Sequence, residues 1–122
     1  ERTKYSYTLK NGRDFAMVLS DKFCVSAVKS GKTDIFYYSA EKDENTEKIL
    51  AEIKSCFEYF GSSFGEYPYK TFSVVETEFI LGGMEYSGLC YIAESQDPDE
   101  KLTPLFTKRR ISGGELPSGT IR

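Results

Sequence analysis

Short runs typical of β-strands fill the first forty residues: some alternate hydrophobic with polar side chains, and residues 15–19 are continuously apolar, as in a strand covered on both faces. Short turns carrying Gly, Asn, Ser or Lys separate four such runs, which cover residues 5–9, 15–19, 23–28 and 33–38. The first turn contains Asn11-Gly12, which suits a tight hairpin because both residue types tolerate positive φ. Antiparallel pairing is the simplest arrangement of short strands joined in this way.

The hydrophobic period changes to that of a helix over about residues 46–60. Asn45 or Thr46 can cap its first N–H groups, and Gly61 or Gly65 can end it. Apolar residues recur here at spacings of one, three and four, and the resulting stripe predicts packing on a sheet: Ile49, Leu50, Ile53, Cys56, Phe57 and Phe60.

Strand patterns resume after the helix, at residues 71–76, 78–81 and 89–92. Residues 95–122 have no sustained periodicity. The predicted fold class is therefore α+β, with mainly antiparallel β-strands, one long amphipathic helix packed on a sheet, and an irregular C-terminal tail.

The chain has 122 residues, enough for one core, and no histidine. It therefore cannot by itself form a Ser-His-Asp or Cys-His catalytic group, or a zinc site that needs imidazole. A net charge of −3 argues against a nucleic-acid partner, because phosphate binding needs clustered Lys and Arg. No apolar run approaches the ~20 residues of a membrane helix, and the first residues do not resemble a secretion signal, so a cytoplasmic location is favoured.

Three cysteines, Cys24, Cys56 and Cys90, lie far apart among apolar neighbours. They form no CxxC pair, and an odd number cannot all pair within one chain. We expect them to be free and buried rather than part of a disulfide or metal site.

Residues 81–85, Leu-Gly-Gly-Met-Glu, admit two interpretations. Gly82-Gly83 between apolar runs suits the two-residue loop of a hairpin. Alternatively, the two glycines let the backbone of a ligand approach, and Glu85 holds an ammonium group. A segment of the second kind binds a ligand and does not itself cleave one.

Two spaced motifs give the sequence a resemblance to zinc metallopeptidases of the aminopeptidase N type. Residues 64–69 read Phe-Gly-Glu-Tyr-Pro-Tyr, Val74-Val75 follows in a predicted strand, and residues 82–85 read Gly-Gly-Met-Glu. In the family, Phe-Gly-x-Tyr-Pro-Tyr ends a helix, and Gly-x-Met-Glu-Asn recognises the free amino terminus of a substrate. Residues 11–18 also resemble the strand that closes the family's amino-terminal β-domain, so the similarity covers about residues 5–94.

The resemblance implies three parts and one binding site. Residues 1–40 would end an amino-terminal β-domain, residues 41–94 would begin a thermolysin-like catalytic domain, and residues 95–122 would be a tail of unknown role. The backbone of Gly82 and Gly83 would bind an extended peptide as an added strand, and the Glu85 carboxylate would bind its ammonium group. Met84 belongs to the same substrate-binding motif and is expected to pack, while Tyr86 and Ser87 stand where the family commonly has Asn and Pro.

The zinc site of the family has no counterpart in this sequence. In the family, a His-Glu-x-x-His helix and a later Glu hold the zinc, and that helix is expected shortly after the equivalent of residues 89–92. We therefore expect no catalytic residue, no metal ligand and no cofactor in this chain. Zinc is the cofactor of the parent family. A polypeptide that ends before the zinc helix and a change of reading frame both fit the sequence.

The sequence thus predicts a fragment of a zinc-dependent aminopeptidase that recognises the amino terminus of a peptide and is inactive alone. One alternative is a small non-enzymatic α+β module that binds a peptide or sugar through its Tyr and Phe residues. Another is a purely structural piece without a ligand. If a missing layer normally covers the sheet, apolar faces and edge strands are exposed, and we expect a homo-oligomer.

Overall fold

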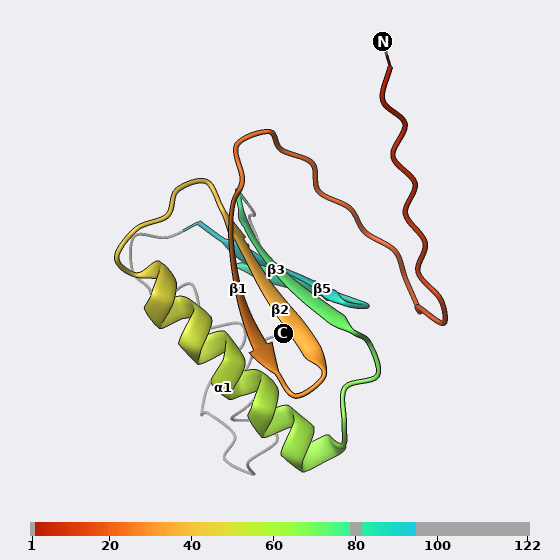
Figure 1. The fold of residues 1–122 in the computed structure, drawn as a ribbon, viewed down its shortest axis with the longest axis vertical. Coiled ribbons are helices and arrows are strands. Elements are labelled where there is room, and N and C mark those ends of the chain that lie inside the picture. Colours follow the sequence, from red (N-terminus) through yellow and green to blue (C-terminus); the bar gives the residue numbers. More distant parts are fainter. Residues whose placement is uncertain (1, 79–81, 95–122) are drawn as a thin grey trace.

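A five-stranded sheet with one helix beside it forms the described part of the chain (Figure 1). This computed structural model describes residues 2–78 and 82–94. Residues 79–81 of the predicted strand over 78–81, and the predicted tail over 95–122, lie outside the described residues. In chain order, the elements are β1 (Cys24–Ser30), β2 (Thr33–Ser39), α1 (Thr46–Phe64), β3 (Thr71–Thr77), β4 (Gly83–Tyr86) and β5 (Leu89–Ala93).

The sheet is mixed, with strand order β1-β2-β3-β5-β4. The outer pairs, β1–β2 and β4–β5, are antiparallel, and the inner pairs, β2–β3 and β3–β5, are parallel. Parallel neighbours need a crossover connection, and α1 supplies it between β2 and β3. The α+β class with one long helix on a sheet is confirmed, and the two parallel pairings add to the antiparallel hairpins that the sequence predicts. The resemblance places a domain boundary at residue 40, and strands from both sides of this position, β2 and β3, pair within the same sheet.

The helix α1 forms where the apolar stripe predicts it and continues four residues further, to Phe64. Asn45 does not cap it through its side chain. Instead, the Asp43 N–H donates to the Thr46 hydroxyl and the Asp43 carboxylate accepts from the Asn45 N–H, at 3.1 and 3.0 Å. At the other end, Gly65 has φ +101° and its N–H donates to the Gly61 carbonyl, so Gly65 ends the helix and Gly61 lies within it.

The core lies between α1 and one face of the sheet. Cys56 and Cys90 are buried, Cys24 is half-buried, and all three cysteines are free. The helix contributes aliphatic side chains, and the strands contribute alternate residues, because successive side chains of a strand point to opposite faces. The buried residues of this core are Ile35, Tyr37, Ile49, Leu50, Ile53, Val74, Cys90 and Ile92.

The strands predicted over residues 5–9 and 15–19 are wrong, because both segments are without regular secondary structure. The chain turns between them at Asn11, which has the predicted positive φ of 58°. Both segments lie on the side of the sheet away from α1 (Figure 1). There, Ala16 and Val18 line a cavity of about 300 Å³ together with Tyr38 and Val75. Segments lying over a face rather than beside an edge find no strand with which to pair.

Tyr37 and Glu76 form a buried polar pair within the core. The Tyr37 hydroxyl donates to the Glu76 carboxylate from the neighbouring strand, and the tyrosine is only 1% exposed. Burial, reinforced by the hydrogen bond to Glu76, raises the pKa of Tyr37 above its usual range. The phenol therefore stays protonated and keeps its proton available to the carboxylate.

Replacing Tyr37 by Phe should lower the free energy of unfolding by about 1–3 kcal/mol, because a buried carboxylate loses a donor. Urea unfolding followed by circular dichroism measures the change. Tyr38→Phe is the matched control, since Tyr38 lies on the opposite face and is half-buried. Equal stability of the two variants would contradict the assigned role of the pair.

Candidate functional site

The predicted binding segment lies at the edge of the described sheet. Gly82 precedes β4, and Gly83, Met84 and Glu85 are its first three residues. Gly82 has φ +75°, a conformation that side chains disfavour, although a Cβ there would meet no atom within 4 Å. Because Gly83 is part of a strand, Gly82-Gly83 is not the two-residue loop of a hairpin.

The tight turn of this hairpin lies instead at Ser87-Gly88, between β4 and β5. Gly88 has φ +81° and its carbonyl accepts a hydrogen bond from the Ser73 N–H at 2.9 Å. The turn is therefore tied to β3 as well as to its own strands.

The register of β4 determines which of its backbone groups face outward. The Ala93 N–H donates to the Gly82 carbonyl at 2.8 Å, which makes this a hydrogen-bonded pair. Bonded and non-bonded pairs alternate along an antiparallel ladder. Gly83 and Glu85, one and three positions further, therefore direct their N–H and C=O groups away from β5, toward the outer edge.

The side chains of β4 alternate between the two faces of the sheet. Glu85 lies opposite Cys90, on the face that carries α1, and its side chain is exposed. Met84 lies opposite Tyr91 on the other face and is 40% exposed, so it packs only in part. Tyr86 contacts the Tyr91 ring edge-on, with ring centroids 5.4 Å apart.

A set of polar contacts links the β4–β5 turn to the N-terminal segment. The Ser87 N–H donates to the Asp14 carboxylate at 2.8 Å, and the Arg13 N–H donates to the Ser87 hydroxyl at 3.2 Å. The hydrogen bond from the Ser87 N–H is the main cause that holds the pKa of Asp14 below its usual value. The sequence analysis missed Asp14, because no local pattern connects residues that are 73 positions apart.

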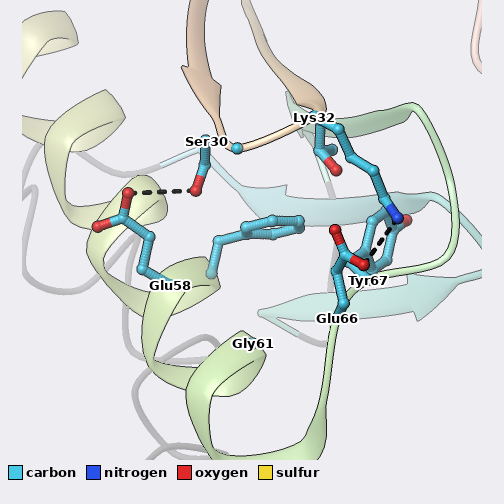
Figure 2. Close-up of a pocket in the computed structure, with 9 residues that line it drawn as sticks. Ser30, Lys32, Glu58, Gly61, Glu66 and Tyr67 are labelled. Carbon is cyan, nitrogen blue, oxygen red and sulfur yellow. Dashed lines mark hydrogen bonds and ion pairs between the residues drawn. The ribbon is translucent and has the colours of Figure 1, made fainter.

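A second cavity, of about 260 Å³, lies where the β1–β2 turn meets the C-terminal half of α1 (Figure 2). Its charged groups all have ion-pair partners: the Lys54 ammonium lies 3.7 Å from the Glu58 carboxylate, and the Lys32 ammonium lies 2.8 Å from the Glu66 carboxylate. The Ser30 hydroxyl also donates to Glu58, at 3.1 Å. An aromatic wall includes Tyr67, whose ring meets that of Phe57 at 5.0 Å. The internal pairing leaves no unbalanced charge that would select a ligand.

The Tyr67 hydroxyl is buried and has no hydrogen-bond partner among the described residues. Burial raises the pKa of Tyr67 to about 12. Because the folded-state pKa lies above the unfolded value of about 10, folding is favoured most fully below pH 10, where the phenol is protonated in both states. The free energy of unfolding then falls as pH rises from about 10 toward 12, because the phenol ionises first in the unfolded chain.

Tyr67→Phe should raise the free energy of unfolding by up to ~1 kcal/mol at neutral pH, because it removes a buried hydroxyl without a partner and keeps the ring. The advantage over the unsubstituted chain should grow between about pH 10 and pH 12. Urea unfolding at neutral pH and within this alkaline interval tests both parts. A variant less stable than the parent at neutral pH would show that the hydroxyl has a partner.

The described residues contain no group of three or more His, Cys, Asp and Glu that could hold a metal ion. Nor does any helix in the described ranges have the length and apolar character required to cross a membrane. The predicted binding segment offers a strand edge and a carboxylate, groups that can hold an extended backbone and a cation.

No family model matches the sequence, and no curated protein matches it. Among solved structures, the fold is similar to an aminopeptidase N family protein from Idiomarina loihiensis, with a TM-score of 0.51 and 15% sequence identity. The match covers 66% of this chain and 16% of that protein, so the chain spans a small part of its structural relative. At this identity the likeness concerns the fold alone.

Proposed function

We propose that this chain forms part of a zinc-dependent aminopeptidase and supplies the strand that recognises the amino terminus of a peptide substrate. The observation that carries the proposal is the edge strand β4, where backbone groups of Gly83 and Glu85 face outward and the Glu85 side chain is exposed. The similarity in fold to an aminopeptidase N family protein supports the same conclusion.

An extended peptide would add to the outer edge of β4 as a further strand. Main-chain hydrogen bonds give such complexes their affinity, and side-chain contacts give them specificity. The two glycines present no side chain that would hinder the approaching backbone. Glu85 would then bind the peptide ammonium through a charge-assisted hydrogen bond, which favours free amino termini over internal segments.

Zinc does not fit the donors that residues 2–78 and 82–94 provide. The sequence has no histidine, and the described residues contain no cluster of metal-binding side chains. We therefore assign no catalytic residue to the chain and propose that it binds peptides without hydrolysing them. The remaining parts of the enzyme would supply the metal site.

Glu85→Gln should weaken binding of a peptide with a free amino terminus by about tenfold, since a charge-assisted bond contributes about 1.5–3 kcal/mol and solvent reduces this at an exposed edge. Isothermal titration calorimetry measures the affinity, and Glu41→Gln, at another exposed carboxylate, is the matched control.

Acetylating the amino group of the peptide should cause a similar loss with the parent chain and little further loss with Glu85→Gln. This non-additivity distinguishes a direct contact between carboxylate and ammonium from a general effect of charge. Equal binding of acetylated and free peptides by the parent chain would refute the proposal.

We also propose that the chain associates with further copies of itself through its exposed apolar surface. Large apolar side chains are exposed mainly on the N-terminal segment and on the strands at the two edges of the described sheet, and such patches promote association. They are Tyr5, Tyr7, Phe15, Met17, Leu19, Val25, Phe64 and Met84.

Light scattering coupled to size exclusion should give the mass of a dimer or larger species, and Leu19→Lys should shift it toward the monomer. Leu19 is 74% exposed, so the charge disturbs association rather than the fold. Ser6→Lys adds the same charge at an exposed polar position and serves as the control. A monomer at every concentration would exclude self-association.

A further inference from the structure

The first residue of the β4–β5 turn makes an unusual long-range contact. In a two-residue hairpin turn, the N–H of the first turn residue lies outside the ladder and needs another acceptor. Here the Asp14 carboxylate accepts it at 2.8 Å, while the Ser87 hydroxyl accepts the Arg13 N–H at 3.2 Å. These two reciprocal hydrogen bonds are called the Asp14–Ser87 clasp below.

The N-terminal side of the clasp is itself held in place. Asn11, at φ +58°, forms the turn that precedes Asp14, and its carbonyl accepts a hydrogen bond from the Tyr69 hydroxyl at 3.2 Å. The Arg13 guanidinium lies 3.3 Å from the Asp14 carboxylate, but it is 83% exposed and contributes little, as solvent screens such pairs. Asp14 therefore acts mainly as the hydrogen-bond acceptor of the Ser87 N–H.

The clasp lies next to the recognition strand. The strand β4 has only four residues and pairs with β5 alone among the described strands, so its position depends strongly on the turn at its end. Ser87 follows Glu85 by two residues. Opening the turn would shift the carboxylate and the outward backbone groups of β4 together.

We propose that Asp14 is a positioning residue, which fixes β4 through the N–H of Ser87 and so presents Glu85 to the amino terminus of a peptide. The effect on peptide binding rests on the proposed function, whereas the effect on the order of β4 does not. A segment that runs outside the sheet thereby becomes part of the recognition site.

Amide hydrogen exchange of the full chain, followed by NMR, tests the effect on β4. Asp14→Ala should speed exchange of the Met84 and Tyr86 amides by about tenfold and leave core amides such as Val74 unchanged. Asp14→Asn keeps an acceptor oxygen and should restore most of the protection. Asp21→Ala, at an exposed carboxylate of the same segment, is the control and should change neither.

The parent chain provides a second signature that needs no variant. The groups facing Asp14 are the Arg13 guanidinium from its own segment and the N–H and hydroxyl of Ser87 from the turn. The Ser87 amide resonance should therefore titrate with the carboxylate, with a pKa below the ordinary value of 3.8. The clasp is intact above this pKa and is lost as pH falls through it, and no such titration should occur in Asp14→Asn.

Peptide binding completes the test, and each outcome has a definite meaning. Asp14→Ala should weaken binding several-fold without a matching fall in the urea midpoint. Unchanged exchange of β4 or an untitrating Ser87 amide would overturn the proposal. Faster exchange with undiminished peptide binding would overturn the positioning role. Faster exchange in a chain whose parent form binds no peptide would refute the proposed function and support the ordering of β4 by the clasp.

Discussion

The parallel pairing of β2 and β3 is the constraint on which the rest of the structure depends. Parallel neighbours cannot be joined by a tight turn, so the chain must leave the sheet after β2 and return at its opposite end. The helix α1 makes this return, and its apolar stripe buries Ile35 and Val74 at the centre of the sheet. With β3 placed in this way, β5 pairs parallel to it, and β4 is left at the edge.

The parts of the fold that local patterns encode could be predicted from the sequence. The stripe of Ile49, Ile53 and Cys56 predicted α1, and the runs around Gly31 predicted the β1–β2 hairpin. An alternating run over residues 5–9 and a continuous apolar run over residues 15–19 predicted strands that do not form. Side chains in the second segment do differ in exposure, since Ala16 is half-buried and Phe15 is exposed. A hydrophobic pattern records burial, but it does not show whether a partner strand is within reach.

The candidate site was harder to predict than the helix, because its geometry depends on contacts between residues far apart in the sequence. Gly82 has a positive φ, but Gly82-Gly83 and Ser87-Gly88 are both suitable for a hairpin turn when taken alone. The pairing of Gly83 with Ile92 decides between them, and no local rule supplies that register. The edge position of β4 likewise follows from the order of five strands. The hydrogen bond between Asp14 and Ser87 depends on the register of β4 and on its place at the edge. The residue types near Gly82 therefore could not predict it.

The proposed peptide recognition and the proposed self-association would place competing demands on the same strand. An edge strand that accepts an extended peptide can also pair with another chain, and proteins limit this risk with short edge strands and charged side chains. The strand β4 has both features: it is four residues long, and Glu85 places a charge in its middle. Such a short strand buries little surface of its own and gains most of its order from its ends. The Ala93–Gly82 hydrogen bond at one end and the turn at Ser87-Gly88 at the other therefore matter more for the position of β4 than the ladder between them.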